Sequence, residues 1–139
     1  YMTGVTGERR VNVIIIKEDL SHIYEISEAF ARNELVCMHA DRFLEGNKTM
    51  EAVFLGEKAP FPIGPFVLAT TFKVPMSFVF AMKEGWKHYH LFATPIKEYS
   101  QQGRNEMMRQ MLNDYVGEME KKVKQYPVQW YNYYNFWQH

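Results

Sequence analysis

The stretch from Val11 to Lys17, with the sequence VNVIIIK, restricts the fold of this chain more than any other segment. Its residues are β-branched and apolar almost throughout, which is typical of a strand buried on both faces of a largely parallel sheet. Such a strand needs neighbours on both sides, so we expect further sheet upstream of Tyr1. The segment therefore predicts an α/β protein built around a sheet.

The rest of the chain alternates helical and strand-like patterns. A helix is predicted between residues 19 and 33 and a second buried strand at 35–39, which gives a strand–helix–strand unit with a right-handed parallel crossover. The other predicted elements are strands at 50–55, 75–82 and 87–94, a proline-rich loop at 56–65, and helices at 66–73 and 103–125. This order predicts a three-layer α/β fold, with a mixed, mostly parallel sheet and flanking helices, in one domain over residues 1–139.

Charge and cysteine content exclude several classes of protein. The chain has 16 basic and 16 acidic residues, so it lacks the positive charge that nucleic-acid binding usually needs. Its single cysteine, Cys37, can form no internal disulfide and no thiolate cluster by itself, and its place in a predicted strand indicates a buried apolar residue. No apolar run approaches the roughly 18–20 residues of a transmembrane helix.

The first candidate site lies at the end of the second predicted strand, where His39, Asp41 and Arg42 follow one another closely. Sites in open α/β sheets gather beyond the carboxyl ends of strands, so these side chains could orient a polar substrate. The alternative is a solvated Asp–Arg pair on a loop, which contributes little energy. His39 and Asp41 could also ligate a metal, but no third ligand stands at a suitable spacing, and we predict no metal site.

The second candidate is the segment from Ala59 to Pro65, which leads into the helix predicted from Phe66. Unpaired N–H groups at a helix start can bind a phosphate or a carboxylate. Pro65 removes one of these donors, and no lysine follows as it does in a phosphate-binding loop. The residues by themselves therefore favour a rigid turn that positions the helix.

Two apolar patterns remain near the end of the chain. A methionine-rich stripe on the last predicted helix indicates core packing rather than an acyl-chain site, since its members have helical spacing: Met108, Met111, Leu112, Tyr115, Met119 and Val123. Six of the eight residues from Trp130 to Trp137 are aromatic. We expect most of these rings to pack back over the sheet and a minority to face a membrane or lipid.

Several motifs, in this order and spacing, resemble the lipid A biosynthesis acyltransferases, a family of the lysophospholipid acyltransferase type. The motifs are NELVCMHADR at 33–42, FLG at 54–56, APFPIGPFVLA at 59–69, the strand at 74–80 and YPVQW at 126–130. Together they cover most of the chain, from about Val11 to Trp137. The residues around Lys83, His88 and Asn132 look closer to a branch of predicted bacterial acyltransferases.

The chain departs from this family at the catalytic motif. The family carries H-x-x-x-x-D/E near the start of its domain, where the histidine is the general base. None of the five histidines here is followed by an acid at that spacing. The resemblance therefore implies the C-terminal part of such a domain, inactive by itself.

The resemblance also implies a site and its substrates. Asp41 and Arg42 would support the acceptor or the thioester, His39 would bind substrate, and Phe61, Pro62, Gly64 and Pro65 would shape the cleft. It implies no cofactor, an acyl carrier protein or coenzyme A thioester as donor, a lipid acceptor, and a peripheral position at the cytoplasmic face of the membrane. The open alternatives are a thioester hydrolase and a non-enzymatic lipid-binding or scaffolding module. The edge of the strand from Val11 to Lys17 could pair two copies of the chain.

Overall fold

The computed structural model describes residues 11–16, 21–42, 46–100, 103–133 and 135–137. The chain forms two compact units, residues 1–38 and residues 39–139. In the first unit, helix α1 (Ser21–Ala31) buries His22, Ile26 and Ala29, which share one face of the helix because they lie three or four residues apart. The helix ends where Asn33 adopts a φ of 56° and the N–H of Glu34 donates to the carbonyl of Ala29 at 2.9 Å.

The second unit begins with an antiparallel hairpin of strands β1 (Thr49–Phe54) and β2 (Glu57–Pro62). Leu55 and Gly56 form its two-residue turn, with φ angles of 52° and 92°, and this left-handed geometry matches the twist of the strands. Helix α2 (Gly64–Phe72) follows directly, with Pro65 in its first turn.

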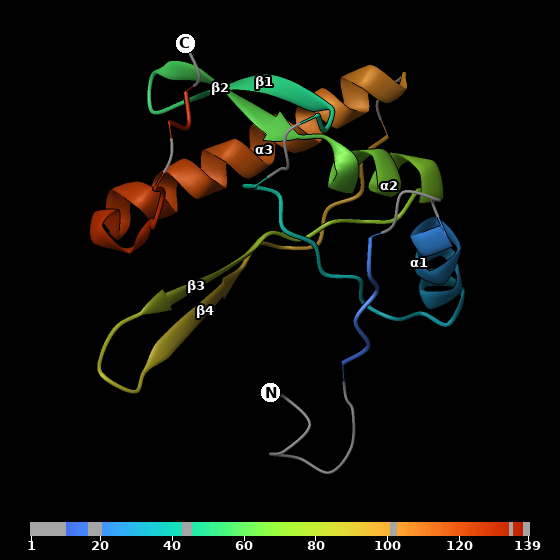
Figure 1. Cartoon of the computed structure of the whole chain (residues 1–139), viewed down its shortest axis with the longest axis horizontal. Coiled ribbons are helices and arrows are strands. Elements are labelled where there is room, and N and C mark those ends of the chain that lie inside the picture. Colours follow the sequence, from blue (N-terminus) through green and yellow to red (C-terminus); the bar gives the residue numbers. More distant parts are fainter. Residues whose placement is uncertain (1–10, 17–20, 43–45, 101–102, 134, 138–139) are drawn as a thin grey trace. The chain divides into compact units, whose positions relative to one another are not determined.

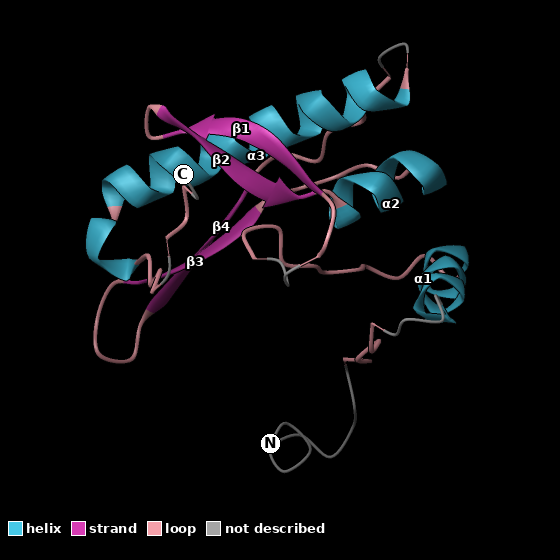
Figure 2. Cartoon of the chain, turned by 45° about the horizontal axis from the view of Figure 1, so that its top comes forward, coloured by secondary structure: helices cyan, strands magenta, loops and turns pink. Residues whose placement is uncertain are grey.

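A second antiparallel hairpin joins β3 (Val79–Lys83) to β4 (Tyr89–Ala93), and an isolated bridge pairs Met76 with Lys97 beyond it. The longest element is helix α3 (Arg104–Gln125), which ends just before the short 3₁₀ helix η1 (Pro127–Gln129). Helix α3 contacts β1, α2 and η1, and runs beside the first hairpin (Figures 1 and 2).

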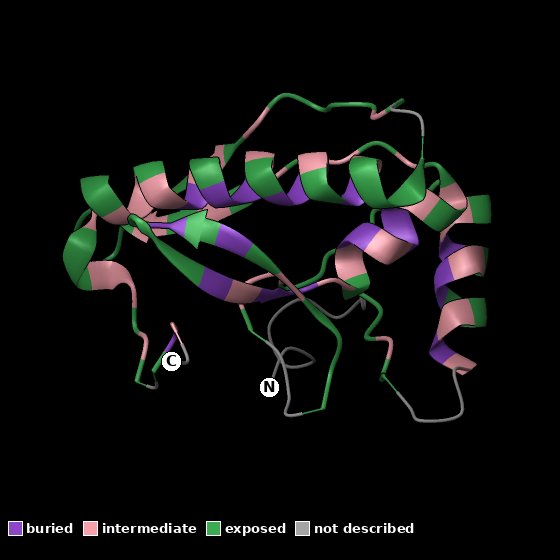
Figure 3. Cartoon of the chain, turned by 90° about the horizontal axis from the view of Figure 1, so that it is seen from above, coloured by how far each residue is buried: buried purple, intermediate pink, exposed green. Residues whose placement is uncertain are grey.

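The core of this unit lies between α3, the first hairpin and the aromatic tail. Figure 3 shows the buried residues of α3 along one side of the helix. The largest side chains with almost no exposed surface are Phe54, Phe61, Phe66, Met111 and Leu112. The methionine-rich stripe predicted as core packing is confirmed, because Met108, Met111 and Met119 are all buried.

The predicted mostly parallel, three-layer sheet is wrong for the residues that the structure describes. The fold is mixed α/β, but its strands form two separate two-stranded antiparallel sheets. Residues 11–16 and 35–39 form no strand, and Lys17 lies outside the described residues. A β-branched run has the propensity for a strand, yet a strand forms only where its backbone groups pair with a neighbour. Cys37 is likewise exposed, not buried in a strand.

Strand β2 corrects the loop predicted at 56–65. Pro60 and Pro62 suggested irregular structure because proline cannot donate to a strand ladder. In this two-stranded hairpin β2 has an open edge, and the two prolines lie two residues apart, opposite Glu51 and Thr49. Alternate residues of an edge strand direct their N–H away from the partner, so both prolines are accommodated without a lost hydrogen bond.

Candidate functional site

Asp41 and Arg42 lie on the segment that opens the second unit, just before β1. Ala40 packs against the core, and the side chain of Asp41 is only 29% exposed. The Nε of Arg42 lies 3.7 Å from Oδ2 of Asp41, and its Nη2 donates to the carbonyl of Tyr131 at 3.2 Å. The guanidinium therefore ties this segment to the C-terminal tail.

The carboxylate of Asp41 acts on a buried phenol of α3. Burial, and next the negative charge of Asp41, raise the pKa of Tyr115, so this side chain stays a neutral phenol. The Tyr115 ring is stacked on Phe80 and lies edge-on to Phe61, at 6.2 and 6.3 Å between centroids. The charge of Asp41 therefore acts on a ring that contacts both hairpins.

The proline–glycine segment predicted to shape the cleft takes two different positions. Phe61 has no exposed surface, and Pro62 beside it is buried at the end of β2. Gly64 is exposed and Pro65 half-buried in the first turn of α2. In this structure Phe61 belongs to the core and Pro62 is buried next to it in the chain, and their assignment to a substrate site stays a prediction.

The structure brings some of the predicted residues together. The rings of Phe61 and Phe66 lie 6.3 and 6.2 Å from the ring of Tyr115, and the charge of Asp41 acts on the same side chain. His39 is exposed, and its predicted role in substrate binding is not tested by its position. Phe61, Phe66 and the charge of Asp41 all act on Tyr115, which the sequence pattern marked only as a core position.

A groove of about 400 Å³ lies elsewhere, between the first hairpin and α3. It is lined by Glu51, Ala52, Val53, Lys58, Arg109 and Asn113, none of which is a predicted site residue. Among the described residues, no group of three or more His, Cys, Asp or Glu side chains could hold a metal ion. No helix in the described part of the chain is long and apolar enough to cross a membrane.

The YPVQW motif forms contacts that its sequence did not reveal. Gln129 makes two hydrogen bonds with the backbone of Lys83: it accepts from the N–H and donates to the carbonyl, both at 2.7 Å. The hydroxyl of Tyr126 donates to Oε1 of Glu84 at 2.9 Å, and Trp130 packs 5.2 Å from Phe54. The motif thus joins the end of α3 to both hairpins. The only sequence signal was the resemblance itself.

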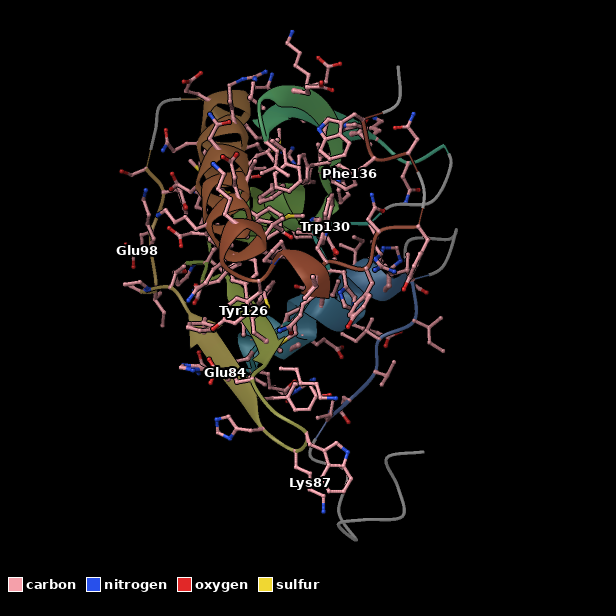
Figure 4. All side chains as sticks on the ribbon, turned by 90° about the vertical axis from the view of Figure 1, so that its left-hand side faces the viewer. Glu84, Lys87, Glu98, Tyr126, Trp130 and Phe136 are labelled. Carbon is pink, nitrogen blue, oxygen red and sulfur yellow. The ribbon has the colours of Figure 1, made fainter. Side chains whose placement is uncertain are left out.

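The two histidines of the second hairpin meet the same carboxylate. Nδ1 of His90 lies 3.3 Å from Oε1 of Glu84, and Nε2 of His88 lies 3.9 Å from Oε2. Glu84 is therefore the centre of a polar cluster that also includes Tyr126 (Figure 4).

Comparison with known proteins places the whole chain in a family. The model of the family described as "Bacterial lipid A biosynthesis acyltransferase" matches residues 5–139. No curated protein and no solved structure matches the chain. The family match spans both compact units and contains all the motifs that carried the resemblance. The chain therefore belongs to the bacterial lipid A biosynthesis acyltransferase family.

Proposed function

We propose that this chain is part of an acyltransferase that moves a fatty acyl group from a thioester to a lipid or aminolipid acceptor. The donor is acyl carrier protein or coenzyme A, and the reaction takes place at the cytoplasmic face of the membrane. The observation that carries the proposal is the family match over residues 5–139. The reaction requires no metal or organic cofactor, because the thioester is already an activated acyl group.

The transfer is a direct displacement at the thioester carbonyl. An acceptor oxygen or nitrogen attacks the carbonyl carbon and the carbon–sulfur bond breaks. The acceptor's proton passes to a base, and the sulfur leaves as a thiol once it is protonated. This chain contains no H-x-x-x-x-D/E pair to supply that base. We therefore expect no acyl transfer from these 139 residues alone.

Asp41 and Arg42 have supporting roles in this proposal. A guanidinium held beside a reacting thioester stabilises the negative charge that develops on its oxygen. Arg42 is restrained by its contacts with Asp41 and the Tyr131 carbonyl, which would fix its direction. His39 contributes to substrate binding, and the segment with Phe61, Pro62, Gly64 and Pro65 supports the wall of the cleft.

The test is the exchange Asp41→Asn in the longest form of the protein that can be expressed. We expect kcat to fall at least about tenfold while the unfolding free energy changes by less than about 1 kcal/mol, because the contact with Arg42 is partly exposed. Arg42→Gln should lower turnover more than Arg42→Lys, which keeps the charge. Glu118→Gln, the same kind of change on α3, is the control and should leave turnover intact. Full turnover in Asp41→Asn would contradict the supporting role.

A second candidate is a non-enzymatic lipid-binding or scaffolding module. The burial of Phe61 and Pro62 favours it, since these side chains then serve only the architecture. Lipid binding without acyl transfer in every expressible form would support this candidate. A third outcome, release of free fatty acid from the thioester, would indicate a hydrolase that uses water as acceptor.

A further inference from the structure

The hairpin of β3 and β4 presents an apolar face that the described residues of the second unit do not cover. Its register pairs Val79 with Ala93, Ala81 with Leu91 and Lys83 with Tyr89, and all six residues are exposed. Exposed fractions reach 63% for Val79, 61% for Tyr89 and 69% for Leu91. These residues alternate with the inward ones, so they form one continuous surface.

The opposite face holds the hairpin in place. Phe80 stacks on Tyr115, and the ring of Phe92 lies under Nζ of Lys122 at 3.5 Å from its centroid. Gln129 fixes the end of β3 through the backbone of Lys83. The outward face is therefore a rigid surface on a hairpin anchored from behind.

The connection between the strands adds an exposed aromatic ring and cationic side chains. Trp86 is 84% exposed, and Nζ of Lys87 lies 4.6 Å from the centre of its ring. Lys83 lies on the outward face beside Tyr89. Figure 4 shows Lys87 at the end of the hairpin, away from Trp130 and Phe136.

Negative charge is turned away from this surface. Glu84 is the only acidic residue from Val79 to Ala93. Its carboxylate accepts a hydrogen bond from the hydroxyl of Tyr126 (Figure 4). It also lies beside His90, which shares the inward face of the hairpin with Phe92. The outward side is thus apolar and aromatic with a positive border, the composition of surfaces that enter the interface of an anionic bilayer.

We propose that the outward face of this hairpin, with Trp86 and Lys87 at its tip, is a docking surface for an anionic lipid bilayer. Trp86 and Tyr89 occupy the headgroup region, Leu91 reaches the acyl boundary, and Lys83 and Lys87 meet lipid phosphates. The inference rests on the proposed function only in its assumption that the protein works at a membrane. It adds the surface through which the chain would bind that membrane. Lipid binding requires no turnover, so the two can fail separately.

The first experiment measures binding of the whole chain to sedimented vesicles of phosphatidylcholine with and without phosphatidylglycerol. The chain should bind the anionic vesicles more tightly. The double variant Trp86→Ser/Leu91→Ser should bind them at least about tenfold more weakly, because two interfacial apolar side chains are lost. Removing one charge, as in Lys87→Gln, should weaken binding about fivefold. Val53→Ser, an exposed apolar residue on β1, is the matched control and should bind as the unaltered chain does.

The second experiment locates Trp86 itself. Brominated lipids should quench part of the tryptophan fluorescence, and Trp86→Phe should abolish that quenching, since Trp130 and Trp137 pack in the aromatic core. Equal vesicle binding by the double variant, or quenching that survives in Trp86→Phe, would overturn the proposal. The proposal would also be overturned if sedimentation equilibrium showed that the surface pairs two copies of the chain and this dimer did not bind the vesicles. Vesicle binding by this chain, together with no acyl transfer in any longer form of the protein that can be expressed, would contradict only the proposed function.

Discussion

Hairpin β1–β2 and hairpin β3–β4 have the same topology and distribute their apolar side chains in opposite ways. In the first, Phe54, Ala59 and Phe61 have no exposed surface, while the outward side carries Glu51 and Lys58. In the second, no described residue of either strand is fully buried, and Val79 and Leu91 face outward. The outward side of the first hairpin carries charged residues beside Val53, whereas the second hairpin has mainly apolar side chains on both of its sides.

The difference indicates a division of roles. An antiparallel pair with one apolar face completes a core, because the other face can meet water. A pair that is apolar on both faces needs a second partner, and such an exposed apolar surface marks an interaction site. Hairpin β1–β2 thus contributes mainly stability, and hairpin β3–β4 combines packing on α3 with a contact outside this chain.

The most disruptive test of this division is Phe54→Ala. The ring of Phe54 contacts Phe61, Trp130, Phe136 and Trp137, with centroids 5.2 to 6.1 Å apart. Removal of a fully buried ring loses its transfer free energy and leaves a cavity, and typically costs about 3–5 kcal/mol. Urea unfolding followed by circular dichroism should show a loss of this size.

The matched variant is Phe92→Ala in β4. Its ring is only partly buried against Lys122 and Tyr126, so it should cost about half as much or less. If the two variants lose equal stability, the hairpins share the work of holding the unit together and the proposed division of roles is wrong.

Local patterns predicted the elements that depend on local physics. Helix α3 lies where its methionine-rich stripe placed it, and α2 begins at Gly64, two residues before the predicted start at Phe66. Strand β2 was not predicted, because prolines such as Pro60 and Pro62 normally interrupt a strand. A strand with an open edge tolerates them, and the sequence does not show which strand has one. From Val11 to Ile16 the error is the opposite one, since a strand was predicted and none forms. Strand propensity does not show whether a pairing partner exists.

The candidate site divides along the same line. Asp41 and Arg42 were marked by residue type and by their place after an apolar run. In the structure the charge of Asp41 acts on Tyr115, and Arg42 donates to the Tyr131 carbonyl. The joint between Gln129 and Lys83 spans 46 residues and uses backbone atoms, so no periodicity could reveal it. Contacts of this kind depend on how elements pack, which a single sequence does not encode in its spacing.

That joint offers a more moderate test. Gln129→Ala removes the acceptor and the donor that pair with the Lys83 backbone, and leaves two peptide groups without their partners. The cost should be about 1–3 kcal/mol, and the amide of Lys83 should exchange its hydrogen faster. Gln125→Ala is the control, since Gln125 accepts only a long bond from Lys122 at 3.4 Å, and it should change neither quantity measurably. Unchanged exchange at Lys83 in Gln129→Ala would show that the packing of Phe80 and Phe92 alone holds the hairpin.

The smallest expected effect concerns the segment that follows β4. Asp114 on α3 accepts hydrogen bonds from Lys97 at 2.6 Å and from Tyr99 at 2.8 Å, and so ties this segment to the helix. Burial opposes its ionisation, but the bonds from Lys97, Tyr99 and Gln110 outweigh burial and lower its pKa. A carboxyl whose pKa is lower in the folded state contributes stability above its unfolded pKa, near 3.9, and loses it as the pH falls through the folded pKa. Asp114→Asn should therefore lower the unfolding free energy at pH 7 by up to about 1 kcal/mol, since the pair is partly exposed, and the difference from the unaltered chain should shrink below about pH 4.

The control is Glu118→Gln, which removes a carboxylate whose ion pair among the described residues is with Lys121 on the same helix. Its effect should be smaller because no second segment depends on it. A loss in Asp114→Asn that is the same at pH 3 and pH 7 would mean that the segment after β4 is held by packing rather than by charge, which would make the second hairpin more like the first.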